Sequence, residues 1–283
     1  MPSIRAAGRS PSSTVPALQK TDTPQLAAGS FHYATDYHRF SKYLTSGLRS
    51  ESSCGTICDI KGSLVMNDIT CPLCNSPTQH YCEDKFREYL QCMTCGLVFV
   101  PPKYLLSAQD EKIQYDFHEN DPSDVGYRKF LSRMSIPMTE FLKAGDHGLD
   151  FGSGPGPTLS LMFEELGYKM EIYDPLYATD ESVLENQYDF ITATEVVEHF
   201  HNPIKSLNKM WNCLKPDGYL GIMTKLVIDQ TAFTNWHYKN DPTHVCFFST
   251  KTFNWLTNHW QAEIVFREND VIILQKMKPG SQI

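Results

Sequence analysis

The sequence predicts an α/β fold: a doubly wound, mostly parallel sheet with a terminal antiparallel hairpin, preceded by a small cysteine-bearing module. Three observations support this prediction. After Gly145, short apolar segments alternate with helical patterns, as a parallel sheet with helices on both faces requires. The first apolar segment ends in a glycine-rich loop that leads into a helix. Four cysteines in two CxxC pairs precede the alternating region.

Residues 1–65 are expected to be a disordered N-terminal extension, because they are rich in Ser and Thr and show no sustained hydrophobic period. The first twenty residues contain Arg5, Arg9 and Lys20 but no acidic residue. This composition fits a solvated tail, and it also fits an organellar transit peptide. Met66 offers an alternative start of translation, in which case residues 1–65 have no role in the fold.

Residues 66–105 are predicted to form a zinc ribbon. Two CxxC pairs separated by 17 residues have the spacing of a structural zinc site, because each CxxC turn directs two sulfurs to one tetrahedral centre. About thirty residues cannot bury an adequate core, so zinc is expected to supply the folding free energy. The predicted ligands are Cys71, Cys74, Cys92 and Cys95. Two independent redox dithiols are the alternative, and His80 and Cys82 are less suitable ligands. The pattern indicates a separate module.

Residues 106–144 are predicted to be a helical linker and lid. Apolar residues at mixed spacings of three and four predict a helix over 127–143, which Pro137 should kink or divide. The main domain is expected at 145–283. Its predicted strands are HGLDFG, KMEIYDP, YDFITATEV and GYLGIMT, the last following a Pro216-Asp217-Gly218 turn. Its predicted helices are PTLSLMFEELG, PIKSLNKMWNCLK and STKTFNWLTNHW, and AEIVFRE and VIILQK should form the terminal hairpin.

Composition and charge exclude some classes of protein. No apolar run reaches the roughly 18 residues needed to cross a bilayer, which excludes a membrane-spanning protein. Residues 66–283 carry 18 basic and 29 acidic side chains, a net charge of −11, so nucleic acid is not the expected default partner. Nine cysteines without a secretory signal favour a reducing compartment, and a cytoplasmic protein is expected. The sequence does not indicate an oligomeric state.

The strongest chemical signal is the loop Asp150-Phe151-Gly152-Ser153-Gly154-Pro155-Gly156 between a strand and a helix. Its glycines let the backbone approach a ligand where side chains would collide. The third position after Gly154 is Pro157, so the loop lacks the GxGxxG pattern of dinucleotide sites. Asp174 ends the next strand, where a carboxylate can accept both hydroxyls of an adenosine ribose. A nucleoside-containing ligand is therefore predicted, and the alternative is a glycine turn that only packs a helix on a strand.

From about residue 125 onward, the chain resembles the class I S-adenosylmethionine (SAM)-dependent methyltransferases, whose first motif is an acidic-glycine loop of this form. The resemblance implies a Rossmann-like domain that binds SAM. The cofactor-binding residues that it implies are Asp150, Gly152, Ser153, Gly154, Gly156, Asp174, Thr194 and Glu195. Only 14 residues separate Asp174 from Asp189, which predicts an abridged third βα unit. The contact to adenine is therefore unassigned, with Asp180 or Glu181 as candidates.

A second cluster of candidate ligands follows the strand YDFITATEV. In the run Glu195-Val196-Val197-Glu198-His199, residues three and four apart share one side of a helical turn, so the two glutamates and the histidine should converge. Carboxylates and an imidazole suit Mg²⁺, Mn²⁺ or Zn²⁺. Without a metal, Glu198 would cap backbone amides or orient the cofactor loop.

A later loop carries further candidates for catalysis. His244 is predicted to act either as a base or as a fourth metal ligand, beside Glu198 and His199, and Trp236 and Tyr238 are predicted to clamp a substrate. The E-x-x-E-H pattern with a later His resembles ubiquinone-pathway O-methyltransferases and small-RNA terminal 2'-O-methyltransferases. Both groups methylate hydroxyls.

The expected function is methyl transfer from SAM to a hydroxyl of a small molecule. A zinc ribbon before a methyltransferase domain resembles an arrangement in some sugar C-methyltransferases and some ribosomal-RNA methyltransferases, and suggests that the ribbon presents a substrate. One alternative is therefore an RNA methyltransferase that uses the ribbon for this purpose. Another alternative is a SAM-binding scaffold without activity, in which the ribbon recruits partners.

Overall fold

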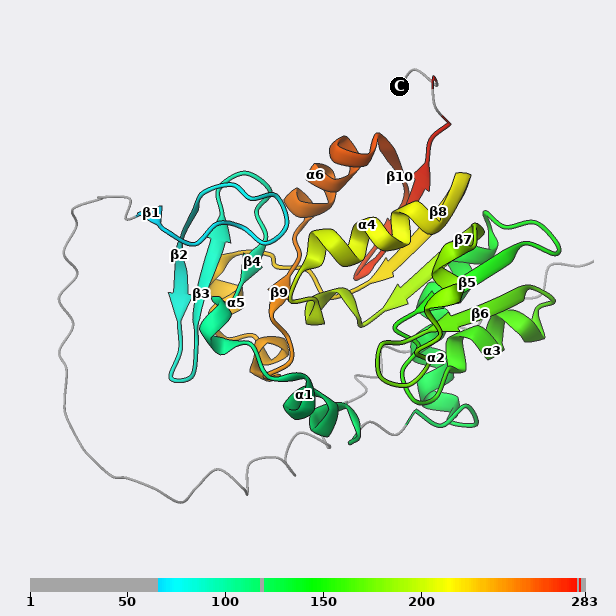
Figure 1. The fold of residues 1–283 in the computed structure, drawn as a ribbon, viewed down its shortest axis with the longest axis horizontal. Helices are drawn as coiled ribbons and strands as arrows, with labels where there is room; N and C mark the ends of the chain where they lie inside the picture. Colours follow the sequence, from blue (N-terminus) through cyan, green and yellow to red (C-terminus); the bar gives the residue numbers. More distant parts are fainter. Residues whose placement is uncertain (1–65, 118–119, 279, 281–283) are drawn as a thin grey trace, which may run out of the picture. The chain divides into compact units, whose positions relative to one another are not determined.

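The computed structural model describes residues 66–117, 120–278 and 280. The predictions of a disordered extension and of a transit peptide fall on residues 1–65 and lie outside the described residues. The described part contains two sheets, and most of their strands are labelled in Figure 1. Within it, every helix is too short or too polar to cross a bilayer.

The larger sheet contains the strands predicted after Gly145. Its strand order is β10-β11-β8-β7-β5-β6. The four strands β6, β5, β7 and β8 are parallel, whereas β11 pairs antiparallel with β8 and forms a hairpin with β10. The bounds are β5 (His147–Phe151), β6 (Lys169–Tyr173), β7 (Tyr188–Thr194), β8 (Leu214–Met223), β10 (Ala262–Glu268) and β11 (Val271–Lys276). The predicted doubly wound sheet with a terminal antiparallel hairpin is confirmed.

Helices cover both faces of this sheet (Figure 1). On β11, Val271 and Ile273 belong to an apolar cluster with two helices, α2 and α3, whereas Ile272 and Leu274 belong to a second cluster with α4 and α6. Because side chains alternate along a strand, the two helix pairs lie on opposite faces. The bounds are α2 (Val125–Thr139), α3 (Thr158–Glu165), α4 (Pro203–Cys213) and α6 (Thr250–Trp260).

The helix α2 is continuous through Pro137, so the predicted division of this helix is wrong. The proline lies in the last turn, and only two helical residues follow it. The carbonyl of Pro137 accepts a bond from the Glu140 N–H at 3.3 Å.

The strand β8 begins before the predicted turn at 216–218. Its partner β7 advances from Tyr188 to Phe190 while β8 advances from Leu214 to Tyr219, so the turn residues form a bulge inside the strand. Asp217 has a φ of 63°, which is the left-handed conformation that such a bulge requires. The strand was therefore predicted to start too late, because the predicted turn residues lie inside β8.

The third βα unit is abridged, as the short spacing predicts. The connection between β6 and β7 is fully described and holds a single 3-10 helix, η3 (Glu181–Glu185), in place of a strand and an α-helix. The sheet therefore ends at β6.

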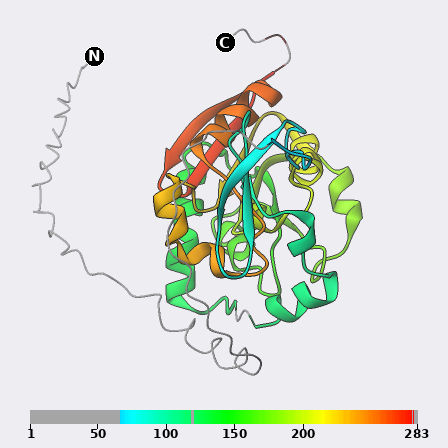
Figure 2. The same ribbon diagram turned by 90° about the vertical axis from the view of Figure 1, so that its left-hand side faces the viewer.

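The predicted ribbon is not a separate module. Its strands are β1 (Met66–Asn67), β2 (Thr78–Glu83), β3 (Glu88–Cys92) and β4 (Val98–Phe99), and the main domain adds β9 (Cys246–Phe247) to the same sheet. β4 pairs with β9, and one apolar cluster runs from the ribbon into the larger sheet. In Figure 2 the ribbon hairpin, in cyan, lies at the front and faces the viewer. A two-residue strand is too short to be predicted from its sequence, which explains the error.

Short elements complete the fold and carry much of the site. They are η2 (Pro102–Tyr104), α1 (Ala108–Tyr115), η4 (Val197–His199), α5 (Gln230–Thr234) and η5 (His237–Asn240). Both α1 and α2 lie in the stretch predicted to be a helical linker. In α1, the Ser107 side chain caps the first turn by accepting a bond from the Asp110 N–H.

Gly148 in β5 leaves room for the ring of Phe190 in β7. A Cβ at Gly148 would lie 2.3 Å from Phe190 Cζ. We expect Gly148→Ala to lower the free energy of unfolding by about 1–3 kcal/mol, as overpacking of a core does. Urea denaturation would measure the loss, and Phe190→Leu in the same chain should restore part of it. A Gly148→Ala variant as stable as the wild type would contradict this packing.

Candidate functional site

The glycine loop lies at the carboxyl edge of the larger sheet, directly after β5. Gly152 and Gly154 have φ values of 78° and 65°, which favour glycine over every other residue. A Cβ at Gly152 would lie 2.5 Å from Val196 Cγ2, and a Cβ at Gly156 would lie 1.9 Å from the carbonyl oxygen of Asn120. Glycine is therefore required here by backbone conformation and by close packing.

Asp174 connects this loop to the end of β6. Its Oδ2 accepts a bond from the Gly154 N–H at 3.0 Å, and its Oδ1 accepts bonds from the N–H groups of Leu176 and Tyr177 at 2.8 and 3.1 Å. A carboxylate has about four acceptor positions. Asp174 can therefore orient the loop and still accept a bond from a ribose hydroxyl.

Asp150 lies at the end of β5, beneath the loop. It is buried, and its Oδ1 accepts a bond from Thr192 Oγ1 of β7 at 2.9 Å. Burial raises the pKa of Asp150 to about 6. The geometry gives Asp150 the role of joining the ends of β5 and β7.

Three buried side-chain oxygens among the described residues have no hydrogen-bond partner: Ser153 Oγ, Thr194 Oγ1 and Glu195 Oε1. All three belong to residues expected from the sequence to bind the cofactor. Buried polar groups nearly always have a partner, so these oxygens fit a site that a polar ligand completes. Glu195 also has a φ of 53°, a strained conformation for this residue that is found most often at functional sites.

Glu198 lies next to Glu195 and is completely buried. Its Oε2 accepts a bond from Thr224 Oγ1 at 3.0 Å, and its Oε1 accepts one from the Tyr238 hydroxyl. The same hydroxyl lies 3.3 Å from Glu195 Oε2. Burial, together with the charge of Glu195, raises the pKa of Glu198 to about 8. Tyr238, expected from the sequence to clamp a substrate, is buried and bonds these carboxyl groups instead.

His199 and His244 face each other beside Glu198, with ring centroids 4.7 Å apart. His199 Nδ1 bonds the carbonyl of Thr243 at 3.2 Å, and His244 Nδ1 bonds the carbonyl of Tyr238 at 2.7 Å. Because a carbonyl can only accept, each Nδ1 carries a proton, and Nε2 is the basic nitrogen of the neutral ring. Burial lowers the pKa of His244 to about 4, so this ring is neutral at pH 7.

The structure thus brings together the three residues predicted to be catalytic. The ligand atoms of Glu198, His199 and His244 all lie within 4.8 Å of one another. Glu195 is not part of this group, although the Tyr238 hydroxyl connects it to Glu198. One carboxylate and two imidazoles are a donor set that Mg²⁺, Mn²⁺ or Zn²⁺ accepts.

Two residues at this site were not found by sequence reasoning. Tyr115 of α1 packs edge-to-face on His199, with centroids 5.3 Å apart, and no motif marks it. Thr224 follows β8 directly, just as Glu195 follows β7. Its position after a buried parallel strand was a usable signal, because such positions meet at one edge of the sheet.

The four predicted zinc ligands form a second cluster. Cys71 Sγ lies 3.6 Å from Cys95 Sγ, and Cys74 Sγ lies 3.3 Å from Cys92 Sγ. Four sulfurs at about 2.3 Å from one zinc ion lie about 3.8 Å apart, so the thiols fit a tetrahedral ion with small adjustments. Backbone N–H groups of Leu73 and Cys95 also point at the sulfurs, as CxxC turns require.

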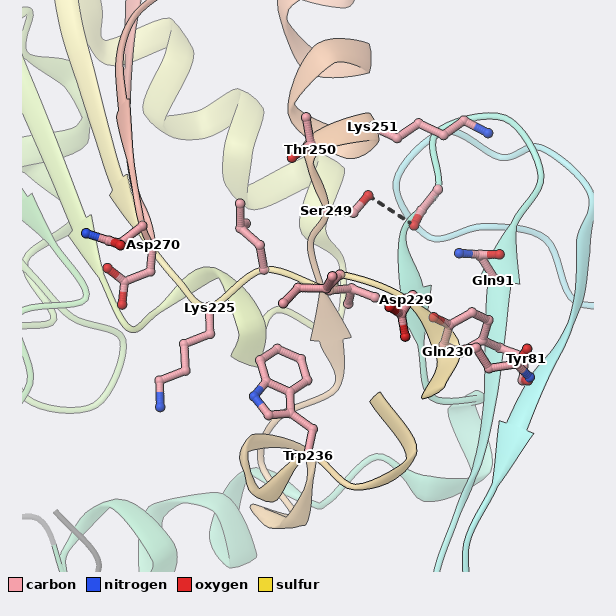
Figure 3. Close-up of a pocket in the computed structure, with 15 residues that line it drawn as sticks. Tyr81, Gln91, Lys225, Asp229, Gln230, Trp236, Ser249, Thr250, Lys251 and Asp270 are labelled. Carbon is pink, nitrogen blue, oxygen red and sulfur yellow. Dashed lines mark hydrogen bonds between the residues drawn. The ribbon is translucent and has the colours of Figure 1, made fainter. Parts of the chain in front are cut away.

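An open cleft of about 850 Å³ lies between the ribbon, the segment after β8 and the start of α6 (Figure 3). Trp236, predicted to clamp a substrate, lines this cleft. Its ring centroid lies 4.9 Å from that of Tyr238, and Lys225 Nζ lies 5.2 Å from the same Tyr238 ring. Tyr238 therefore contacts Trp236, which lines the cleft, and bonds Glu198.

A family model described as a methyltransferase domain matches residues 118–265, slightly more than half of the chain. The chain belongs to this methyltransferase family. No curated protein matches the sequence of this methyltransferase. The family assignment agrees with the acidic-glycine loop and with the Rossmann-like sheet, and the protein is a SAM-dependent methyltransferase.

Solved structures with a similar fold are distant in sequence. The methyltransferase is 16% identical to 1,6-didemethyltoxoflavin-N1-methyltransferase from Burkholderia thailandensis, determined with 1,6-didemethyltoxoflavin and S-adenosylhomocysteine. That comparison covers 64% of this chain and 96% of the other, with a TM-score of 0.46. An O-methyltransferase family protein from the same organism is 14% identical, over 60% of this chain and 64% of the other, with a TM-score of 0.41.

Asp174→Ala should weaken SAM binding by the methyltransferase about ten- to a hundredfold, because a hydrogen bond to a charged group contributes about 1.5–3 kcal/mol. Isothermal titration calorimetry would measure the change. Asp189→Ala is the matched control: it also removes a carboxylate that accepts a bond from a backbone N–H, that of His147 at 2.9 Å, but at the start of β7. Equal SAM affinity of the wild type and Asp174→Ala would contradict the role of Asp174.

Proposed function

We propose that this methyltransferase transfers a methyl group from SAM to a hydroxyl of a small molecule, with a divalent cation bound by Glu198, His199 and His244. The observation that carries the proposal is the convergence of their ligand atoms within 4.8 Å, at the sheet edge that also carries the glycine loop. Two imidazoles and one carboxylate leave coordination positions for oxygen atoms of an acceptor.

The protein's own contribution to the reaction is to position the reactants and exclude water. A divalent cation at this site would lower the pKa of a hydroxyl. The hydroxyl proton leaves to water in the open cleft, and the new bond forms between the hydroxyl oxygen and the methyl carbon as the bond from that carbon to sulfur breaks, which leaves S-adenosylhomocysteine. The two reactants must therefore lie in line. Complete burial of Glu198 keeps one side of the site dry, and its bonds to Thr224 and Tyr238 hold the carboxyl group in place.

Cofactor binding is assigned to the glycine loop and to the ends of β6 and β7. The proposed role of Asp174 is to hold the ribose hydroxyls. The buried oxygens of Ser153, Thr194 and Glu195 are proposed to bond the polar groups of the cofactor, which would give each of them a partner.

The segment 106–144 is proposed to be a lid over this site. Its helix α1 places Tyr115 against His199, and its loop places Asn120 against Gly156. A lid in this position would close both the cofactor loop and the proposed cation site.

The cleft beside Trp236 supports a small acceptor. Its volume of about 850 Å³ lies within the range of small-molecule sites, which is about 300–1,000 Å³. Trp236 offers a flat apolar surface to the cleft, and Lys225 offers a positive charge (Figure 3). Lys225 Nζ lies 5.2 Å from the centroid of the Tyr238 ring.

The test is incubation of the protein with a cell extract and methyl-labelled SAM, with and without a chelator. We expect label in a small molecule as a methyl ether, loss of labelling with the chelator, and recovery with Mg²⁺ or Mn²⁺. Zinc content would be measured in the same samples, so that damage to the ribbon is recognised. Label in RNA, undiminished labelling with the chelator, or SAM binding without any labelled product would each overturn the proposal.

A further inference from the structure

We call residues 236–245 the catalytic loop, because they carry Tyr238 and His244. Only four of its residues form a helix, the 3-10 helix η5 (His237–Asn240). The carbonyls of the remaining loop cannot be satisfied by regular secondary structure and need donors from elsewhere. The position of the loop also fixes the orientation of the His244 ring, because His244 Nδ1 bonds the carbonyl of Tyr238.

Four carbonyls of the catalytic loop accept bonds from one side chain of the ribbon, Arg87. Its Nη1 donates to the carbonyls of Pro242 and His244 at 3.3 and 3.0 Å, and its Nη2 donates to those of Lys239 and Asp241, the latter at 3.1 Å. The side chain is 8% exposed. A guanidinium holds its N–H groups in a rigid plane, so it can fix several carbonyls in one arrangement.

A buried ion pair ties the ribbon to the same loop. Lys239 Nζ donates to Asp84 Oδ2 at 2.5 Å, and the Tyr89 hydroxyl donates to the same oxygen at 3.0 Å. Although burial opposes ionisation, the bond from Lys239 and the turn N–H groups lower the pKa of Asp84 to about 2. The Asp84 carboxyl group is therefore ionised at neutral pH. The lysine of the pair is almost completely buried, so water screens the pair little.

Backbone pairing continues the connection up to Glu198. The Val100 N–H of the ribbon donates to the Val245 carbonyl at 3.0 Å, and the Val245 N–H donates to the Glu198 carbonyl at 2.8 Å. One chain of hydrogen bonds thus runs from the ribbon, through the catalytic loop, to the segment that carries Glu198 and His199.

We propose that Arg87 is a positioning residue, through which the ribbon holds the catalytic loop in the arrangement that brings His244 to Glu198 and His199. The effect of Arg87 on cation binding rests on the proposed function, whereas the fixing of the catalytic loop by Arg87 does not. The ribbon then acts within its own chain, as a support for the site, and need not touch a substrate.

The test compares Arg87→Lys with Arg267→Lys, an exposed arginine of β10, in the zinc-loaded full chain. Lysine keeps the charge but cannot bond four carbonyls. We expect amide hydrogen exchange in residues 236–245 to rise about tenfold or more in Arg87→Lys, with exchange in β5 unchanged. The Mn²⁺ affinity, measured by electron paramagnetic resonance, should fall at least about tenfold while the SAM affinity stays within about twofold. Arg267→Lys should match the wild type.

The outcomes separate this inference from the proposed function. If amide hydrogen exchange in the catalytic loop is as slow in Arg87→Lys as in the wild type, the proposal that Arg87 fixes the loop is wrong. If the wild type does not bind Mn²⁺ but amide hydrogen exchange is still raised in Arg87→Lys, the proposed cation site is wrong. The proposal that Arg87 fixes the catalytic loop is then still supported. An equal loss of SAM and Mn²⁺ affinity would overturn the positioning role in favour of general destabilisation. If Arg87→Lys does not fold, Lys239→Gln is the second variant, with the same readouts and the same expected directions.

Discussion

Removal of zinc from the Cys71, Cys74, Cys92 and Cys95 cluster should unfold the ribbon and disorder the catalytic loop. A structural zinc site contributes about 10–16 kcal/mol of apparent binding free energy in small modules, and whole domains are stable by only about 5–15 kcal/mol. We expect Cys92→Ser to lose zinc and to unfold at a temperature at least about 10 °C lower. Zinc analysis and thermal circular dichroism would measure both quantities.

Cys82→Ser is the control for the zinc experiment, because Cys82 lies in the ribbon strand β2 but outside the cluster. It should keep its zinc and nearly all of its stability. A Cys92→Ser variant that lacks zinc and still unfolds at the wild-type temperature would contradict a structural role for the ion. Because β4 pairs with β9, hydrogen exchange at Cys246 and Phe247 should rise together with exchange in the ribbon when zinc is lost.

Glu198→Gln combined with His199→Ala should abolish methyl transfer and leave SAM affinity unchanged. Glutamine preserves the shape of the buried side chain but loses the negative charge, and alanine removes one imidazole. A metal ion contributes several kcal/mol to stabilisation of the transition state, so labelling should fall by roughly 10³-fold or more. The measurement is transfer of label from methyl-labelled SAM in cell extract, with SAM binding followed by calorimetry.

Glu185→Ala, on the exposed side of η3, is the control for this double substitution. It should transfer label at the wild-type rate. Labelling by the Glu198→Gln, His199→Ala protein at more than about a tenth of the wild-type rate would be incompatible with a catalytic cation at this site. Loss of SAM binding in the same protein would instead assign these residues to the cofactor site or to folding.

Most of the larger sheet could be predicted from sequence because its strands are buried on both faces. Segments such as HGLDFG and YDFITATEV are short and contain several large apolar residues, and glycine or proline separates them from the helices. The pairing of β4 with β9 could not be predicted in this way. Each strand has two residues, and their partners are far apart in sequence.

The site was predictable where its residues follow strands and unpredictable where loops from different modules meet. Asp174 and Glu195 each come directly after a strand, and such positions meet at one edge of a parallel sheet. Arg87 lies in a turn of the ribbon, and its four carbonyl partners belong to the catalytic loop. No local pattern relates an arginine to backbone groups so distant in sequence, so only the structure reveals the contact.

The most direct test of the account is a crystal structure with S-adenosylhomocysteine and Mn²⁺, analysed by anomalous scattering at the manganese edge. We predict S-adenosylhomocysteine against the glycine loop and Asp174, and a manganese peak within coordination distance of Glu198 and of Nε2 of His199 and His244. This prediction is contradicted if these side chains show no peak while Glu198 remains bonded to Tyr238 and Thr224.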